Sequence, residues 1–375
     1  MLAVALLVGV AVFVVLDVVG VAVASSDSSS VGVVVGEVVA LGGAALASLG
    51  TSARAQAVTI TVNGSGGSLA KSLERIYEKP FTAETGIGVR ATAPVSLAKL
   101  KAMVETGNME WDLTEMGGAD MIEGVKNNWL TEIDWSIVDP DNKLPPIARQ
   151  KYGMVTSTFS TVIAYRTDKF GGKAPKSWAD FWDVKSFPGP RALQDSPVQN
   201  LEFALLADGV PADKLYPLDV ERAFKKLDQI KRHVAAWWTT GAQQVQLLVD
   251  GEAVMGTVWN GRVPPLKKEG KPVDIIWNGG ALQLSYWAVP KGAKHPKEAM
   301  RYMKSRLDPD KGVQLLQDSP YPGFAPGLIE KIDPELAKIL PIHPDNVAVQ
   351  YSFNPEYWSE NRPKLTERWA AWLLS

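Results

Sequence analysis

The sequence contains no cysteine, and this absence excludes several kinds of chemistry at once. Without thiols the chain forms no disulfide, carries no thiolate nucleophile and offers no cysteine ligand to a metal ion. Histidine is almost as rare, and the three histidines, His233, His295 and His343, are scattered along the chain. A metal site needs several ligands that converge on one point, so we expect no bound metal and no cofactor.

The sequence also lacks a block of basic residues. Its 39 Lys and Arg residues are interspersed with 41 Asp and Glu residues, and the formal net charge at pH 7 is -2. Neutralising a phosphate backbone takes clustered positive charge, so nucleic acid is not an expected partner. What the chain does have is ordinary globular composition, with 375 residues of which 46% are hydrophobic, enough for two hydrophobic cores.

Residues 1–57 differ in composition from the rest of the chain. Their only charged residues are Asp17, Asp27, Glu37 and Arg54. An apolar run over 38–49 followed by Ala55-Gln56-Ala57 is typical of an export signal, so we expect cleavage after Ala57. Because no Lys or Arg precedes Arg54, two alternatives stay open. We favour a start codon assigned too far upstream over a membrane anchor formed by residues 1–24.

Alternating strand and helix patterns begin at residue 58. Residues 58–62 (VTITV) alternate as in a strand, a Gly/Ser loop interrupts them, and Leu69 and Leu73 follow at helical spacing. Further strands are predicted over 87–91 and 111–116. Repeated β/α units predict an α/β fold with a mostly parallel sheet that helices cover on both faces.

Two glycine-containing loops follow predicted strands of this sheet. Ligands of such sheets bind outside the carboxyl ends of the strands, where the backbone N–H groups of these loops suit a polar or anionic ligand. The candidate binding residues in the loops are Ser65, Gly66, Gly117 and Gly118. Loop glycines also serve simply to permit turns, and neither loop matches a nucleotide-binding fingerprint, so this signal alone is not specific.

The second half of the chain reads as a further α/β unit. A β-rich run over 155–166 is long enough to cross into it, and strands over 273–277 and 282–290 are expected to cross back. Within it a buried strand over 253–259 ends at Trp259, with Arg262 just beyond, so both lie where a ligand is expected. Helices are predicted over 199–207, 219–232, 296–318, 328–340 and 357–374.

Four motifs occur in an order that resembles one protein family. They are GSGGS at 64–68, WADFWDVKSFPG at 178–189, DGEAVMGTVWNGR at 250–262 and SYWAVPKGAKHPKEAMRYM at 285–303. Together they resemble the periplasmic spermidine/putrescine-type binding proteins of bacterial ABC importers, and the resemblance covers residues 58–375.

The resemblance implies a Type II periplasmic binding fold, in which two α/β lobes joined by crossover strands close on a ligand cleft. We expect lobe 1 to comprise 58–163 plus 285–375, with the C-terminal helices, and lobe 2 to comprise 164–284. The family resemblance further implies export to the periplasm, a monomer, and delivery of a small molecule to an inner-membrane ABC permease without chemical change. It therefore implies that the chain is not an enzyme.

The residues that hold polyamines in relatives are changed here. Aligned with such relatives, the two carboxylates of the second lobe fall on Ser196 and Gln199, although Asp195 is adjacent. The carboxylate of the return strand falls on Ser285 and its aromatic neighbour on Gln283. A buried dication without carboxylate partners faces a cost of several kcal/mol per charge, so putrescine and spermidine are the less favoured ligands.

Arg262 instead corresponds to the position at which relatives that bind γ-aminobutyrate hold the ligand carboxylate. A guanidinium binds a carboxylate with two parallel hydrogen bonds, so we expect a small carboxylate-bearing or zwitterionic, amino-acid-like ligand. The residues expected to pack its carbon skeleton or line the cleft rim are Trp238, Trp259, Tyr286, Phe159, Ser160 and Tyr321. The alternative for Arg262 is a salt bridge with a neighbouring acid.

Two other classes of protein fit the sequence less well. An enzyme on a two-lobed scaffold would need a nucleophile with a base, a carboxylate pair or a metal, and no such combination stands out in the sequence. A ferric-ion-binding protein of the same fold would need clustered tyrosines, and the sequence has no Tyr-Tyr pair.

Overall fold

The structure, a computed structural model, describes residues 58–375. The predicted export signal over 1–57, with its cleavage point after Ala57, lies outside the described residues. Within 58–375, no helix combines the length and the hydropathy that crossing a bilayer requires.

One hydrogen-bonded sheet runs through the described part of the chain, with its main strands in the order β2-β1-β3-β10-β6-β9-β7-β8. The strands are β1 (Thr59–Asn63), β2 (Gly88–Thr92), β3 (Leu113–Gly117), β4 (Leu130–Thr131), β5 (Arg149–Gln150), β6 (Gly153–Arg166), β7 (Arg191–Gln194), β8 (Val234–Trp238), β9 (Met255–Trp259), β10 (Val273–Pro290) and β11 (Tyr351–Ser352). The expected strands near 58–62, 87–91, 111–116 and 253–259 are therefore present.

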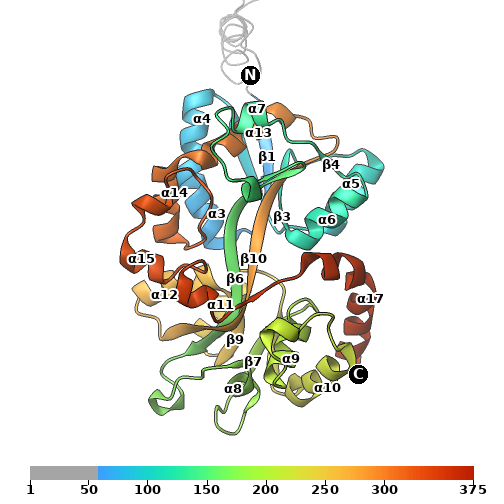
Figure 1. Cartoon of the computed structure of the whole chain (residues 1–375), viewed down its shortest axis with the longest axis vertical. Helices are drawn as coiled ribbons and strands as arrows, with labels where there is room; N and C mark the ends of the chain where they lie inside the picture. Colours follow the sequence, from blue (N-terminus) through green and yellow to red (C-terminus); the bar gives the residue numbers. More distant parts are fainter. Residues whose placement is uncertain (1–57) are drawn as a thin grey trace, which may run out of the picture. The chain divides into compact units, whose positions relative to one another are not determined.

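Helices pack around both ends of this sheet (Figure 1). They are α3 (Gly67–Leu73), α4 (Lys79–Thr85), α5 (Leu97–Thr106), α6 (Gly118–Lys126), α7 (Trp135–Val138), α8 (Trp178–Trp182), α9 (Asn200–Ala207), α10 (Val220–Lys231), α11 (Gln243–Val249), α12 (Val263–Lys268), α13 (Pro296–Lys304), α14 (Pro309–Asp318), α15 (Pro334–Lys338), α16 (Pro344–Val347) and α17 (Pro355–Leu374). A single π-helical turn (Glu74–Glu78) joins α3 to α4, and a 3-10 turn, η5 (Asn260–Arg262), follows β9.

Two long strands, β6 and β10, connect the two ends of the molecule and run side by side through its centre (Figure 1). Strand β10 pairs with β3 at one end, and β6 pairs with β9 at the other. We call the end that contains β1–β3, α3–α7, α13 and α14 lobe 1, and the end that contains β7–β9 and α8–α12 lobe 2. The two-lobed α/β fold with crossover strands is thus as expected from the sequence.

The strand directions combine a parallel arrangement within each lobe with antiparallel crossovers. Strand β1 pairs in parallel with β2 and β3, and β7 pairs in parallel with β8 and β9. Strands β6 and β10 are antiparallel to each other and to their other neighbours in the main sheet, β9 and β3. The sheet is therefore mixed, and the carboxyl ends of the parallel strands in both lobes point toward the centre of the molecule.

Each lobe buries its own hydrophobic core. In lobe 1 the core includes Ile60, Leu113 and Met303, and in lobe 2 it includes Phe203 and Leu227. A core in each half satisfies the expectation that a chain of this length and composition supports two of them.

The C-terminal helix α17 contacts both lobes: Arg362 pairs with Asp120 of α6 in lobe 1, and Arg368 pairs with Glu221 of α10 in lobe 2. Its Trp358, Leu365 and Trp369 belong to the same buried cluster as Phe203 and Leu227. The predicted boundaries, 58–163 plus 285–375 for lobe 1 and 164–284 for lobe 2, stay a prediction.

Candidate functional site

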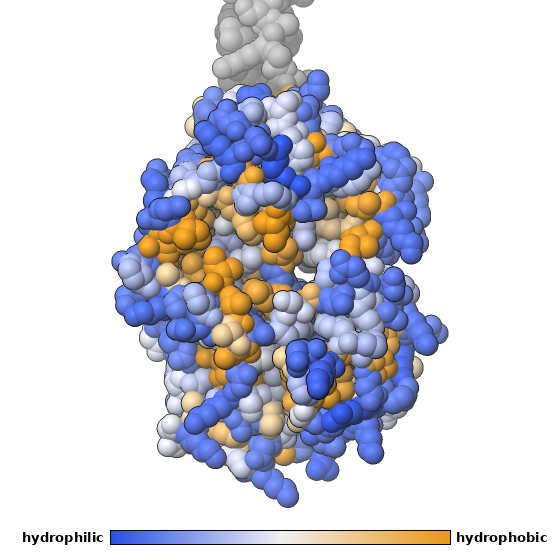
Figure 2. All heavy atoms as spheres, in the orientation of Figure 1, coloured by the Kyte–Doolittle hydropathy of each residue, from blue (hydrophilic) through white to orange (hydrophobic). Residues whose placement is uncertain are grey.

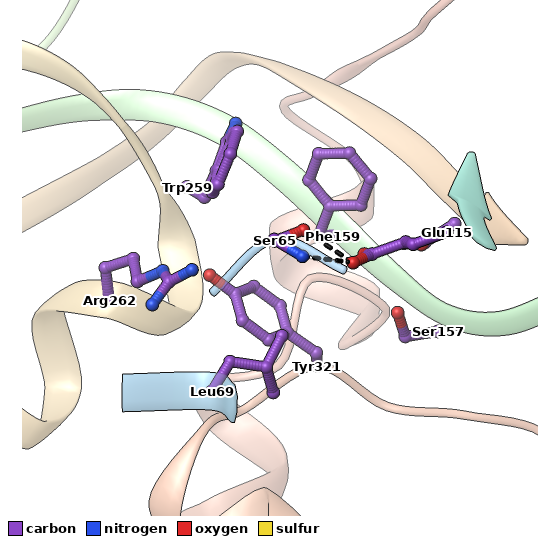
Figure 3. A pocket seen from close by; sticks show the side chains of 9 residues that line it. Ser65, Leu69, Glu115, Ser157, Phe159, Trp259, Arg262 and Tyr321 are labelled. Carbon is purple, nitrogen blue, oxygen red and sulfur yellow. Dashed lines mark hydrogen bonds between the residues drawn. The ribbon is translucent and has the colours of Figure 1, made fainter. Parts of the chain in front are cut away.

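A pocket lies between the lobes, beside the crossover strands. It has an empty volume of about 350 Å³ and we call it the inner pocket (Figure 3). Its lining residues come from both lobes and from β6 and β10: Ser65, Leu69, Glu115, Ser157, Phe159, Trp259, Arg262, Ser285 and Tyr321. The position agrees with the rule that ligands of parallel sheets bind beyond the carboxyl ends of the strands, because Ser65 follows β1 and Trp259 ends β9.

Arg262 carries a buried positive charge on the lobe 2 side of the inner pocket, with 5% of its surface exposed. Its Nη1 donates to Ser68 Oγ and its Nη2 to the Gly66 carbonyl oxygen, both at 3.2 Å. These acceptors are neutral, and the buried Nε has no hydrogen-bond partner. Among the described residues the guanidinium therefore has no anionic partner, which argues against the alternative that Arg262 forms only a salt bridge.

Glu115 carries a negative charge on the other side of the same pocket. In Figure 3 the side chains of Arg262 and Glu115 approach the pocket from opposite sides. The Oε2 of Glu115 accepts hydrogen bonds from the Ser65 N–H at 2.8 Å and the Ser65 Oγ at 2.6 Å. Its Oε1 accepts one from Ser285 Oγ at 2.9 Å. Three donors thus hold the carboxylate in one orientation.

Tyr321 closes the pocket next to Arg262. Its hydroxyl group is buried without a hydrogen-bond partner, and burial raises the pKa of Tyr321 to about 12 although Arg262 opposes this rise. The hydroxyl therefore keeps its proton at neutral pH and offers a hydrogen bond to a ligand. The ring lies against Gly261, where an added Cβ would stand 2.5 Å from a ring carbon, so only glycine leaves this ring in its place.

Aromatic side chains form the wall between the two charged ends. The rings of Phe159 and Trp259 meet edge to face with centroids 6.4 Å apart. The guanidinium carbon of Arg262 lies 5.7 Å from the centroid of Trp259, a cation–π arrangement. The wall is suited to the methylene groups of a short ligand chain.

A larger cavity continues from the inner pocket along the cleft between the lobes, and we call it the groove. Its empty volume is about 830 Å³, and Figure 2 shows a hollow between the upper and lower parts of this face of the molecule. The groove is lined by Ser65, Val95, Glu115, Met116, Gly117, Gly118, Ala119, Asp120, Phe159, Gln194, Ser196, Val198, Gln199, Trp259, Gln283, Ser285, Phe353 and Arg362. Five of these residues also line the inner pocket: Ser65, Glu115, Phe159, Trp259 and Ser285.

The structure brings most of the residues singled out in the sequence to these two cavities. The inner pocket contains Ser65, Phe159, Trp259, Arg262, Ser285 and Tyr321, and the groove adds Gly117, Gly118, Ser196 and Gln283. Gly66 lines a neighbouring cavity of lobe 1 behind the β1–α3 loop.

Trp238 and Ser160 were expected at the cleft, and the structure places both in the protein interior. Trp238 is fully buried, and its Nε1 donates to Thr257 Oγ1 at 3.2 Å. Its ring supports Trp259 from behind, with centroids 5.9 Å apart. Ser160 is also fully buried, and its N–H donates to Asn260 Oδ1 at 2.9 Å. Both residues support the site from beneath and do not line it.

Asp195 and Tyr286 are likewise outside both cavities. Asp195 accepts a hydrogen bond from Trp369 Nε1 at 2.9 Å, so its carboxylate anchors α17. Tyr286 follows Ser285 on β10, and adjacent residues of a strand point to opposite faces. Its ring accordingly packs with the buried residues of lobe 1, and burial raises the pKa of its hydroxyl.

Sequence reasoning missed Glu115, Leu69 and Ser157 as pocket residues. Glu115 stands in β3 two positions before Gly117, which was singled out, and Leu69 stands in the first turn of α3 after the Gly/Ser loop. The position of Glu115 and Leu69 in the sequence could have identified them, because Glu115 lies near the carboxyl end of a strand and Leu69 lies at the start of the helix that follows one. Ser157 offered no such signal, because it lies within the long strand β6.

Comparison with known proteins gives a consistent result. A family model described as "Bacterial extracellular solute-binding protein" matches residues 77–340. The gamma-aminobutyric acid-binding protein of Pseudomonas aeruginosa is 34% identical over 326 residues, covering 85% of this chain and 92% of that protein. The spermidine/putrescine-binding periplasmic protein of Escherichia coli is 27% identical over 279 residues, covering 71% of this chain and 78% of that protein.

The fold is also found among solved structures. The periplasmic binding protein AgtB of Agrobacterium tumefaciens, solved in complex with agropinic acid, is 31% identical and superposes with a TM-score of 0.80. The match covers 85% of this chain and 100% of that chain.

Proposed function

Because this chain belongs to the family of bacterial extracellular solute-binding proteins, we propose that it binds a zwitterionic, amino-acid-like metabolite in the periplasm. We propose further that it delivers this ligand, chemically unchanged, to an ABC permease of the inner membrane. The observation that carries the proposal is the pairing of a buried guanidinium, Arg262, with a carboxylate, Glu115, on opposite sides of one small pocket.

In this proposal the ligand carboxylate binds Arg262. The Nε of Arg262 is buried without a partner, and its Nη1 and Nη2 make only 3.2 Å hydrogen bonds to neutral oxygens. A carboxylate supplies the missing charge and two acceptor oxygens in the geometry of the guanidinium fork. The unpartnered hydroxyl of Tyr321 stands beside it as a further donor.

The ligand ammonium group binds Glu115 in the same proposal. The carboxylate of Glu115 already accepts three hydrogen bonds from Ser65 and Ser285, which hold its orientation, and it lines the pocket opposite Arg262. The methylene groups between the two charges of the ligand pack on Phe159 and Trp259. The name of the Pseudomonas aeruginosa relative, a gamma-aminobutyric acid-binding protein, supports a ligand of this chemistry.

The proposed binding mode also explains how a ligand links the two lobes. Arg262 belongs to lobe 2 but donates its hydrogen bonds to Gly66, in the loop before α3, and to Ser68, in the first turn of α3, both in lobe 1. A ligand held between Arg262 and Glu115 contacts both lobes at once and so favours their closed arrangement over an open one. Differential contacts of this kind are what a ligand needs to shift a conformational equilibrium.

A polyamine is the less well supported ligand. It needs an anionic partner at each end, and the inner pocket provides Glu115 at one end and a cation at the other. In the groove, Asp120 is already paired with Arg362, and the positions of the expected acids are occupied by Ser196 and Gln199.

The proposal is tested by calorimetric titration of γ-aminobutyrate into the chain carrying Arg262→Ala. Removing one partner of a buried charge pair costs about 2–5 kcal/mol, so we expect the affinity to fall by about thirtyfold or more. The matched control is Arg301→Ala, because Arg301 is exposed on α13 and lines neither cavity. An affinity for carboxylate ligands that is the same in the Arg262→Ala variant and the parent would disprove the assignment.

A further inference from the structure

Three consecutive residues of η5 each contribute in a different way to the carboxylate end of the inner pocket. Arg262 presents its guanidinium, and Gly261 leaves room for the ring of Tyr321. Resting on the proposed function, we infer that Asn260 is a positioning residue for the ligand carboxylate. Asn260 lies outside both cavities and fixes the loop of Tyr321, so that the Tyr321 hydroxyl and the Arg262 guanidinium donate to the same carboxylate.

The side chain of Asn260 is fully buried, and both ends of its amide are bonded to backbone groups. Its Oδ1 accepts a hydrogen bond from the N–H of Ser160 in β6 at 2.9 Å. Its Nδ2 donates to the carbonyl oxygen of Pro320 at 3.2 Å. Asn260 therefore joins three segments that are far apart in the sequence: the turn after β9, the crossover strand β6 and the loop after α14.

The loop that carries Tyr321 spans residues 319–323 and directly follows α14 of lobe 1. Besides the hydrogen bond from Asn260, it is tied to β6 through the carbonyl oxygen of Pro322. This oxygen accepts hydrogen bonds from the N–H of Thr158 at 2.8 Å and from its Oγ1 at 3.1 Å. The loop is thus fastened on either side of Tyr321 to β6 and η5, although its chain arrives from lobe 1.

The packing of the Tyr321 ring makes the direction of its hydroxyl depend on the loop. Tyr321 is 6% exposed, and its ring lies against the backbone of Gly261. An added Cβ at Gly261 would stand 2.5–2.8 Å from three carbons of the ring. The ring has no free space in which to turn, so a displacement of the loop displaces the hydroxyl with it. Asn260 therefore acts on the ligand through Tyr321.

The hydroxyl of Tyr321 is directed toward the guanidinium of Arg262 (Figure 3) and has no hydrogen-bond partner. A hydroxyl proton and a guanidinium are both donors, and a carboxylate has two oxygens that accept from both. Because Asn260 holds the loop in place before the ligand arrives, binding does not have to order it.

The test is a double-mutant cycle on the affinity of the chain for γ-aminobutyrate, measured by calorimetric titration. We expect Tyr321→Phe to lower the affinity by about tenfold or more, because a hydrogen bond to a charged group is lost. Asn260→Leu is expected to cause a loss of similar size. In the Tyr321→Phe background, the same Asn260→Leu substitution should change the affinity by less than about twofold.

Asn346→Leu is the matched control. Asn346 is also a buried asparagine whose Nδ2 donates to backbone carbonyl oxygens, those of Lys338 at 2.9 Å and Leu340 at 2.8 Å, and it lines neither cavity. We expect both leucine substitutions to lower the free energy of unfolding, because each leaves backbone groups without a partner. Only Asn260→Leu should lower the affinity, which a merely structural role would leave unchanged.

Thr158→Val provides a second variant if Asn260→Leu does not fold. It removes the hydrogen bond from Oγ1 to the Pro322 carbonyl oxygen and keeps the one from the backbone N–H. We expect a smaller loss of affinity than for Asn260→Leu, and again a loss that is absent in the Tyr321→Phe background.

The possible outcomes separate this inference from the proposed function. If γ-aminobutyrate binds the parent and Asn260→Leu weakens it equally in both backgrounds, Asn260 does not act through Tyr321 and the inference is wrong, while the proposed function stands. An Asn260→Leu variant that folds and binds like the parent also overturns the inference. If γ-aminobutyrate does not bind the parent, both proposals fail.

Discussion

At the scale of single residues, the two charges of the inner pocket are held in different ways. Glu115 accepts three hydrogen bonds, at 2.6–2.9 Å, from Ser65 and Ser285, so its orientation is set before a ligand arrives. Arg262 makes two longer hydrogen bonds to neutral oxygens and leaves its Nε free. In the proposed binding mode, the ligand therefore changes the surroundings of Arg262 more than those of Glu115.

The role proposed for Glu115 is tested by Glu115→Gln, which removes the charge and keeps the size of the side chain. We expect the affinity for γ-aminobutyrate to fall by about tenfold or more, because a hydrogen bond to a charged group contributes about 1.5–3 kcal/mol. Butyrate lacks the ammonium group, so we expect its affinity not to fall. Calorimetric titration of both ligands measures the difference.

The control for this variant is Glu330→Gln, at an exposed position. Equal losses for γ-aminobutyrate and butyrate would contradict the assignment, since they would show that the variant disturbs the pocket as a whole.

Whether the position of a single residue can be predicted depends on whether the local sequence or a distant contact decides where its side chain points. Trp259 and Arg262 follow a buried strand, and the end of a strand fixes where they lie. Trp237 and Trp238 are adjacent in a strand, so their side chains point to opposite faces and at most one of them could face the cleft. Trp238 faces the interior, and Trp237 packs on Trp369 of α17. Neither faces the cleft, since a helix more than a hundred residues away in sequence covers the second face. A contact between residues so far apart in the chain leaves no pattern in the local sequence from which it could be predicted.

At the scale of elements, the expected helices over 296–318 and 328–340 are both interrupted at a proline. Pro309 begins α14, and the preceding Asp308 accepts hydrogen bonds from the N–H groups of Asp310 and Lys311. Pro334 begins α15 after Asp333, which caps it in the same way. In both places an Asp-Pro pair starts a new helix, although the helical spacing of apolar residues in the sequence continues across the pair. The return strands 273–277 and 282–290 proved to be one strand, β10, with an irregular middle.

Helix α17 is fastened to lobe 2 by a buried carboxylate. Glu202 is fully buried, and its Oε1 accepts hydrogen bonds from Tyr216 Oη and Trp358 Nε1, both at 2.6 Å. Its Oε2 has no partner, and burial raises the pKa of Glu202 to about 7. In the unfolded chain the same carboxyl group titrates near its ordinary value of about 4.3.

These pKa values predict how stability depends on pH. Between about pH 4 and 7 the unfolded chain releases the proton of Glu202 while the folded chain keeps it, so the free energy of unfolding falls as the pH rises. The full contribution is about 4 kcal/mol. We expect Glu202→Gln to remove this part of the pH dependence and to stabilise the protein at pH 8, as measured by denaturant unfolding across pH 4–8.

The comparison must be made between the variant and the parent, because burial also raises the pKa of Glu78 to about 7 and adds a change of the same sign. Glu360→Gln, at an exposed position of α17, is the matched control. A pH dependence that is the same in Glu202→Gln and the parent would show that Glu202 is ionised in the folded protein.

At the scale of the whole molecule, a ligand that contacts both lobes stabilises residues 58–375 as a unit. At 100 times its Kd a ligand adds about 2.7 kcal/mol to the free energy of unfolding. In a thermal-shift screen we expect amino-acid-like zwitterions to raise Tm, because they pair with both Arg262 and Glu115. Putrescine and spermidine should leave Tm unchanged, and a rise with either would reinstate the polyamine alternative.

The two irregularities in the pairing of β10 with β6 have a mechanical consequence. They lie between Ile276 and Ala281 and between Ser285 and Tyr286, on either side of the stretch that carries Gln283 and Ser285. A ribbon of hydrogen-bonded strands is least stiff where its ladder is interrupted, so the ribbon flexes most easily next to these two residues. Both of them line the cleft, so in the proposed binding mode the ligand contacts the ribbon at the stretch where its hydrogen-bond ladder is interrupted.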